Sequence, residues 1–154
     1  MADLIFNVAK GRGIQLCKNV EDNSPAAAVL RIFAIVSTDT DAALKVADTM
    51  AAVFALTNTA EATNTNYANI TDDGTDLTIN LDDTNHLHDA ILADQTFTAI
   101  AAGSNWTHLI IAYDADGTDT DANTIPLSAH TFAVTPNGGD IVADFPVTGF
   151  FRAS

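Results

Sequence analysis

The stretch at residues 105–113 constrains the fold of this chain more than any other. It contains the only tryptophan, Trp106, and it is dense in aromatic and β-branched residues. Turn-forming residues bound it at 103–104 and at 114–117, so the pattern predicts a strand. Leu109, Ile110 and Ile111 are consecutive and apolar. Such a run indicates that both faces of the strand are covered, as at the centre of a sheet.

Shorter apolar or alternating runs predict further strands. They lie at residues 14–20, 29–36, 67–70, 77–81, 86–92, 97–100, 125–134 and 141–145. Turn residues at 71–76 and at 135–140 predict hairpins between the runs on either side of them. About seven to nine short strands, spaced about ten residues apart, favour a mainly β fold of the α+β type. We expect an antiparallel β-sandwich or a barrel-like domain.

One segment has the periodicity of a helix. Apolar residues recur at helical spacing at Leu44, Ala47, Met50, Ala51 and Phe54. Residues 38–41 supply side chains that can cap a helix start, and neither Gly nor Pro interrupts the segment. The pattern predicts one helix near residues 41–56 that packs Leu44, Ala51 and Phe54 on the sheet.

The length and composition indicate one folded domain over residues 1–154. A chain of 154 residues can bury roughly two-thirds of its unfolded surface. Its apolar content of 47% is that of an ordinary globular domain. Cys17 is the only cysteine, so we expect a small packed side chain and no intrachain disulfide. Residues 4–6 are interpreted as a short strand or as part of an extended docking arm at residues 1–12.

No apolar run approaches the length of about 18 residues that a membrane span requires. The apolar residues 4–6 are also too few for the core of a targeting peptide. We therefore expect synthesis in the cytoplasm and no membrane partner.

The charged residues are segregated along the chain. Residues 1–45 hold five Lys and Arg and five Asp and Glu, whereas residues 46–151 hold fifteen Asp and Glu and no Lys or Arg. The formal net charge of −14 therefore belongs to the second two-thirds of the chain. Such a body repels phosphate backbones, so we expect no nucleic-acid partner.

The densest acidic segment follows the Trp106 strand. Its carboxylates are Asp114, Asp116, Asp119 and Asp121, and oxygen ligands of this kind can bind calcium. The EF-hand pattern is not met, because Gly117 is at the fourth position and no Glu closes the loop. A solvated acidic loop is the favoured interpretation, and these four residues are the alternative calcium ligands.

No catalytic arrangement can be assembled from the sequence. The four histidines are His86, His88, His108 and His130, and their spacing does not force a metal site, so we expect surface or hydrogen-bonded histidines. Glu occurs only at Glu21 and Glu61, and no Ser–His–Asp set or phosphate-binding loop is present. We expect no cofactor and no enzymatic activity.

A resemblance to a known family is carried by several segments, at residues 1–12, 82–85, 94–99, 109–114 and 149–154. These segments resemble a family of small virion structural proteins of tailed bacteriophages, and the chain departs from the family's pattern at residues 13–19. The family is mostly without an assigned role and has no catalytic motif. The resemblance implies a capsid decoration, or cement, protein, or else a neck or tail component.

We expect a decoration protein that stabilises the outer surface of the head shell and is located on the capsid exterior. Its partners would be the major capsid protein and further copies of itself, as a homotrimer at threefold positions. The docking candidates are Phe6, Lys10, Arg12, Lys18 and Arg152. The alternatives are a neck or tail protein and a soluble phage factor or enzyme that is absent from the particle.

Overall fold

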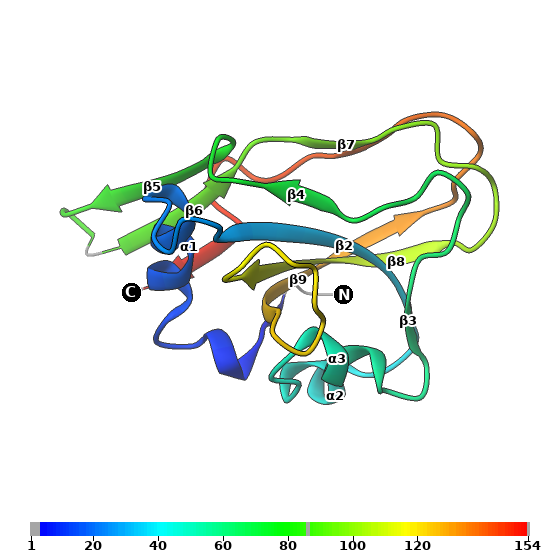
Figure 1. Ribbon diagram of the computed structural model, residues 1–154, viewed down its shortest axis with the longest axis horizontal. Coiled ribbons are helices and arrows are strands. Elements are labelled where there is room, and N and C mark those ends of the chain that lie inside the picture. The colour runs from blue at the N-terminus through cyan, green and yellow to red at the C-terminus, as the bar shows by residue number, and fades with distance from the viewer. Residues whose placement is uncertain (1–3, 86, 154) are drawn as a thin grey trace.

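The computed structural model describes residues 4–85 and 87–153 of the 154-residue chain. Within them the fold has three layers (Figure 1). A six-stranded sheet forms the middle layer, two short helices cover one of its faces, and two smaller sheets cover the other. All strand pairs are antiparallel in the described chain, and the predicted mainly β fold is confirmed.

The main sheet is built around β8 (Trp106–Asp114), the strand predicted at residues 105–113. The sheet order is β1-β9-β8-β2-β3, with β4 also paired to β2. Its other strands are β1 (Leu4–Ile5), β2 (Val29–Ser37), β3 (Thr59–Glu61), β4 (Ile70–Asp72) and β9 (Ile125–Val134). Leu109 and Ile111 enter one core, while Ile110 enters another on the opposite face. The prediction that both faces of β8 are covered is confirmed.

The larger core lies between the main sheet and the two smaller sheets. One small sheet contains β5 (Leu77–Asp82), β6 (Leu87–Leu92) and β11 (Phe151–Ala153), and the other contains β7 (Gln95–Phe97) and β10 (Ile141–Ala143). Trp106 is 1% exposed in this core, and its Nε1 donates to Asn64 Oδ1 at 2.9 Å. The rings of Tyr67 and Phe97 meet the indole edge-on. The tryptophan therefore packs between the layers with its polar atom satisfied.

Both predicted hairpins are wrong. Residues 71–76 do not join paired strands, because β4 pairs with β2 and β5 pairs with β6. Residues 135–140 lead from β9 to β10, and β10 pairs with β7. In both places the chain leaves one sheet and enters another. Turn residues specify a change of chain direction, but they do not specify which strand the chain pairs with afterwards.

The single helix predicted near residues 41–56 is interrupted. The structure has α2 (Asp41–Lys45) and α3 (Met50–Phe54), with a break at residues 46–49. Thr49 caps α3, because its side chain accepts a hydrogen bond from Ala52 N at 3.2 Å. The first N–H groups of α3 donate to the backbone oxygens of Thr124 and Asp121. These partners favour a new helix start over the continuation of α2.

The two helices bury only part of the predicted stripe. Leu44, Ala47, Met50 and Val53 are buried in the smaller core, between the helices and the main sheet. Ala51 is exposed, which contradicts its predicted packing on the sheet. Phe54 is half-buried, and its ring lies edge-on to Phe33 with the centroids 6.0 Å apart. The break at residues 46–49 removes the continuous helical phase on which the prediction rested.

Residues 14–20 form a helix and not the predicted strand. Helix α1 (Gly13–Glu21) packs against β5, β6 and β11 at one end of the molecule (Figure 1). Its buried residues are Gly13, Leu16, Cys17 and Val20. A run this short fits both the strand period and the helix period, so packing decides between them. The Cys17 thiol is packed as expected, and its burial raises its pKa to about 12.

The start of the described chain is part of the body and not an extended docking arm. β1 pairs with β9, and Phe6 N donates to Leu127 O at 3.0 Å. A short 3-10 helix, η1 (Asn7–Ala9), follows. Leu4 and Phe6 are buried in the smaller core, where leaving water stabilises them. The predicted arm is therefore wrong for residues 4–9, and residues 1–3 lie outside the described chain.

Among the described helices, none combines the length and the apolar character needed to cross a membrane.

Candidate docking surface

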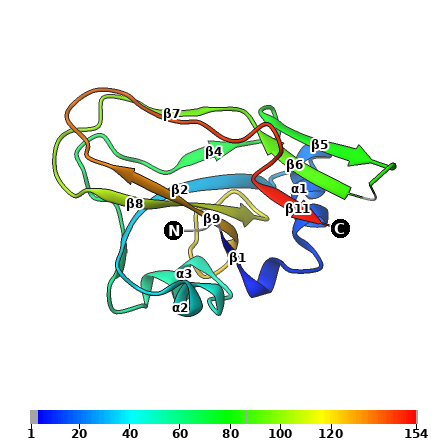
Figure 2. The ribbon, with the colours of Figure 1, turned by 180° about the vertical axis from the view of Figure 1, so that it is seen from behind.

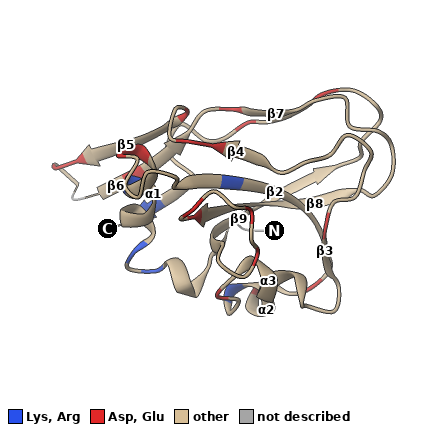
Figure 3. Cartoon of the chain, viewed as in Figure 1, with Lys and Arg blue, Asp and Glu red and all other residues tan. Residues whose placement is uncertain are grey.

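Four of the six Lys and Arg residues lie around one end of the molecule. Lys10 and Arg12 lie between η1 and α1, Lys18 lies on α1, and Arg152 lies on β11. We call these four residues the basic face. Figure 3 shows their positions near α1 and the carboxyl-terminal strand, apart from Arg31 in β2 and Lys45 in α2. Figure 2 shows the same end from behind, with β11 beside β6 and next to the chain that leads into α1.

Three adjoining hollows lie between the cations of the basic face. The first has a volume of about 270 Å³ and is lined by Ile5, Lys10, Gly11, Phe151, Arg152 and Ala153. The second, of about 240 Å³, shares Gly11, Phe151 and Ala153 with the first and adds Arg12. The third, of about 370 Å³, shares Ile14 and Gln15 with the second and extends to Lys18, Ile79, Leu81 and His88. The shared lining makes the three hollows one continuous surface.

The floor of this surface follows from the register of the small sheet. Ile79 pairs with Ala90, which pairs with Phe151, so the three residues share one face. The next row on that face contains Leu81, His88 and Ala153. Phe151 is buried, while Leu81 is 54% exposed. Strand alternation therefore carries an apolar face from the core to the surface at the end of the sheet.

Two cations of the basic face are already paired with carboxylates. Lys18 Nζ lies 2.9 Å from Asp22 Oδ1 and 2.5 Å from Glu21 Oε2, and hydrogen bonds with these two carboxylates raise the pKa of Lys18. Arg152 donates from Nε and Nη2 to the two oxygens of Asp89, at 2.6 and 3.0 Å. This hydrogen-bonded pair raises the pKa of Arg152.

The other two cations have no carboxylate partner within the described chain. Lys10 Nζ donates to the Asn7 side chain at 2.9 Å, and Arg12 Nε donates to Val8 O at 2.9 Å. Both side chains are exposed. Lys10 and Arg12 are therefore the residues of this surface whose charge is available to a partner.

Phe6, the fifth docking candidate, does not belong to this surface. Its ring is fully buried in the smaller core, beside Phe33 and Ile110. This candidate is wrong because β1 and η1 fold back on the main sheet and carry Phe6 inward.

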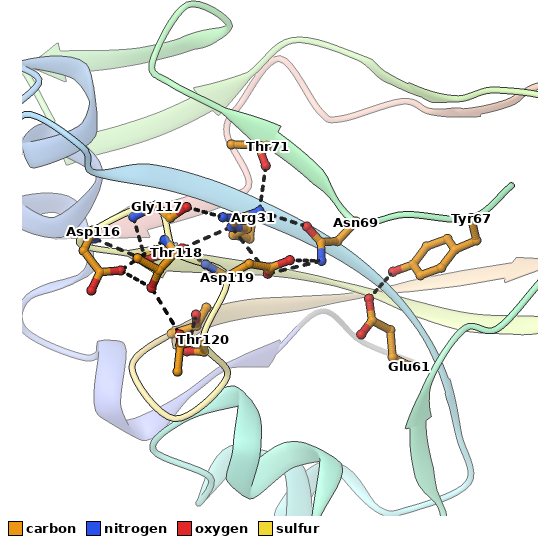
Figure 4. A network of polar contacts seen from close by, with 12 residues as sticks. Arg31, Glu61, Tyr67, Asn69, Thr71, Asp116, Gly117, Thr118, Asp119 and Thr120 are labelled. Carbon is orange, nitrogen blue, oxygen red and sulfur yellow. Dashed lines mark hydrogen bonds and ion pairs between the residues drawn. The ribbon is translucent and has the colours of Figure 1, made fainter.

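Arg31 organises a polar network that sequence reasoning missed (Figure 4). The side chain is 9% exposed, and Nε donates to Asp114 Oδ2 at 3.1 Å. Nη1 donates to Thr71 Oγ1 at 2.9 Å and to Asn69 Oδ1 at 3.3 Å, and Nη2 donates to Gly117 O at 2.9 Å. The network ties the acidic loop to β2 and β4. A lone cation within an apolar strand run was the available signal, since a buried arginine requires a carboxylate.

The four calcium candidates do not converge on a common point. Asp114 accepts backbone N–H groups of Asp116, Gly117 and Asp119 at 3.0 to 3.2 Å, in addition to Arg31. Asp119 accepts from the Asn69 amide, and Asp116 accepts from Thr118. Burial raises the pKa of Asp121. Within the described residues, no group of three or more His, Cys, Asp or Glu is arranged to hold a metal.

The described histidines occupy separate positions. His88 lines the third hollow. His108 is buried in β8 with Nδ1 2.8 Å from Thr107 Oγ1, and its burial lowers its pKa. His130 Nε2 lies 2.9 Å from Ser128 Oγ. His86 lies outside the described residues.

Glu61 is a half-buried carboxylate at the margin of the network in Figure 4. The Tyr67 hydroxyl donates to Glu61 Oε1 at 2.9 Å. Burial is the main cause that raises the pKa of Glu61, and the nearby charges of Asp121 and Asp119 raise it further. Burial also raises the pKa of Tyr67. The tyrosine therefore donates to a side chain whose burial disfavours its charged form.

Comparison with protein-family models, with curated protein sequences and with solved structures finds no match to this chain.

Proposed function

We propose that this chain is a structural protein of a bacteriophage particle, which decorates the outside of the head shell and attaches through the basic face. The observation that supports the proposal is the segregation of charge. The basic face holds four of the six Lys and Arg residues, whereas residues 46–151 hold fifteen Asp and Glu and no cation. Acidic residues also lie at this end, where Glu21 and Asp22 pair with Lys18 and Asp89 pairs with Arg152. Lys10 and Arg12, which have no carboxylate partner in the described chain, make this end better suited to attachment than the acidic remainder.

The charge of the body also argues for the outer side of the shell. A body with a net charge of −14 is repelled by packaged DNA, because both are anionic. On the outside of the shell, with the basic face toward the shell protein and the acidic body toward solvent, the chain avoids that repulsion. A domain that binds the assembled shell more tightly than its separate subunits stabilises the shell by mass action.

The partners in this proposal are the major capsid protein and further copies of the chain. A homotrimer matches the local threefold positions of a shell, and closed symmetry is usual among homo-oligomers. The proposal includes no nucleic-acid or membrane partner, no cofactor and no catalytic reaction.

The number of copies per particle tests this proposal. Quantitative electrophoresis and cryo-electron microscopy of purified particles should find the chain on the head in hundreds of copies. About a dozen copies or fewer at the neck or tail would replace decoration with the neck or tail role, since those structures have few subunits. Absence of the chain from purified particles would contradict both structural roles and favour a soluble phage factor.

A further inference from the structure

We infer, building on the proposed function, that the basic face recognises an acidic and apolar segment of its protein partner. The apolar side chains of that segment enter the three hollows, and its carboxylates meet Lys10 and Arg12. The partner is thereby identified by chemistry, as a chain that alternates apolar residues with Asp or Glu.

The shape of the surface favours protruding side chains over a flat partner. The three hollows adjoin through Phe151, Ala153 and Ile14, and the largest has a volume of about 370 Å³. That volume is at the lower end of the range of sites that enclose ligands. The exposed Leu81 continues the apolar lining outward. Burying such apolar surface against a partner favours a complex.

The edge of the small sheet points to recognition by side chains. β5 is an edge strand, and its Ile79 N donates to Glu21 Oε1 of α1 at 3.1 Å. This contact occupies a backbone donor that an added strand would need. The same carboxylate is held by Lys18 through its other oxygen. A partner segment therefore lies across the hollows and does not extend the sheet at Ile79.

The charge of the surface favours an acidic protein segment over nucleic acid. Lys10 and Arg12 lack carboxylate partners in the part of the chain that the structure describes. Lys10 and Arg12 can together pair with about two carboxylates of a partner, whereas Asp89, Glu21 and Asp22 already pair with Arg152 and Lys18. A nucleic acid presents a row of phosphates, which two cations cannot match, and the apolar floor offers no further donors for them.

A set of four synthetic ten-residue peptides tests the inference. The peptides alternate two residue types and combine acidic or basic residues with apolar or polar ones. We expect the acidic–apolar peptide to bind at least about tenfold more tightly than the other three by calorimetric titration. Its binding should weaken as salt rises, because the cations involved are exposed. In NMR spectra it should shift the resonances of Ile14, Leu81 and Ala153.

Matched variants locate the binding. The double variant Lys10→Glu/Arg12→Glu should lower the affinity for the acidic–apolar peptide about tenfold or more. Leu81→Ser should also weaken binding. Leu81 is exposed, so the change removes little core packing, and the NMR spectrum checks that the variant is folded. Lys45→Glu changes the same kind of charge on α2 and should leave the affinity unchanged.

Specific outcomes would overturn the inference. They are equal binding of all four peptides, no binding of the acidic–apolar peptide, resonance shifts centred elsewhere, or equal effects of Lys45→Glu and the double variant. Tighter binding of a DNA oligonucleotide, or self-association through this face in sedimentation, would replace the partner with nucleic acid or a second copy. Peptide binding by a chain that is absent from particles would contradict the proposed function and leave this inference intact.

Discussion

Arg31 joins three separate segments of the chain through one side chain. It pairs with Asp114, which lies 83 residues away, and it also contacts β4 and Gly117 of the acidic loop. Asp114 is 1% exposed, so its charge is held among the guanidinium and backbone N–H groups. The pair specifies how the acidic loop lies on the sheet, because each partner is costly to bury alone.

We expect Arg31→Met to lower the free energy of unfolding by about 3–5 kcal/mol, because it leaves the carboxylate of Asp114 buried without its cation. Urea denaturation at pH 7 measures the loss. Lys45→Met removes a cation that belongs to no such network and should cost little. The double variant Arg31→Met/Asp114→Asn should recover part of the loss. Equal stability of the Arg31 and Lys45 variants would contradict the role assigned to Arg31.

Removing the charge of Glu61 should stabilise the protein, and the effect should depend on pH. Its pKa is raised, so the folded protein disfavours the charged form, and the ionised carboxylate destabilises the fold at neutral pH. Glu61→Gln keeps an acceptor for Tyr67 and should be more stable than the natural chain at pH 7. The difference should disappear as the pH falls below the ordinary glutamate pKa, where the carboxyl group is neutral in both states. Thermal unfolding from about pH 2 to pH 8 measures the difference.

Asp39 provides the matched control for Glu61. Hydrogen bonds, above all from Thr59, lower the pKa of Asp39, so its ionised form stabilises the fold above its unfolded pKa. Asp39→Asn should therefore be less stable at pH 7, and the loss should disappear in acid. A shift of the same sign in both variants would show that carboxylate neutralisation acts through the net charge alone.

Helix α3 illustrates what holds a short element in place. It spans Met50–Phe54, and five residues do not form a stable helix alone. Thr49 caps its start, and Met50 N and Ala51 N donate to backbone oxygens near the acidic loop. Met50 and Val53 fill the smaller core. The helix therefore depends on packing and on partners from outside the segment.

We expect Met50→Ala to lower the free energy of unfolding by about 2–5 kcal/mol, as large-to-small changes in a core do. Ala51→Ser, at the exposed neighbouring position, should change it by less than about 0.5 kcal/mol. Phe54→Ala should cost less than the roughly 3–5 kcal/mol of a fully buried ring, because Phe54 is half-buried. Chemical denaturation ranks the three variants, and a larger loss for Ala51→Ser than for Met50→Ala would contradict the observed stripe.

The contact between α1 and β11 gives a second prediction at this scale. A Cβ added at Gly13 would overlap Phe151 Cζ, and this ring is buried. Gly13→Ala should therefore lower the free energy of unfolding by about 1–3 kcal/mol through overpacking, although alanine favours helices. Phe151→Leu should relieve the clash. The double variant should therefore lose less free energy of unfolding than the sum of the losses of the two single variants. Gly139→Ala is the control, and additive losses at Gly13 and Phe151 would contradict direct contact.

The net charge of −14 affects the stability of the whole molecule. Like charges in a folded body repel one another, and salt screens that repulsion. We expect the melting temperature at pH 7 to rise with sodium chloride from low to moderate ionic strength. The rise should be small near pH 4.1, the isoelectric point of the sequence, because the net charge there is close to zero. Equal salt effects at both pH values would assign them to causes other than self-repulsion.

The sequence alone determined the features that depend on long local patterns. The runs at residues 29–36, 105–113 and 125–134 predicted β2, β8 and β9, because strands of nine or ten residues repeat their period several times. The consecutive apolar residues Leu109, Ile110 and Ile111 also predicted that β8 is covered on both faces. The sequence also singled out Lys10, Arg12, Lys18 and Arg152, which the structure gathers around adjoining hollows, while their role in docking stays a prediction.

Only the tertiary structure decided the features that depend on partners far along the chain. Residues 14–20 fit two periods, and packing on β5, β6 and β11 makes them a helix. The pairing of β10 with β7, the break between α2 and α3, and the burial of Phe6 likewise depend on contacts that no local window contains. The Arg31–Asp114 pair bridges 83 residues. Local periodicity specifies which face of a segment is apolar, but long-range packing specifies what that face meets.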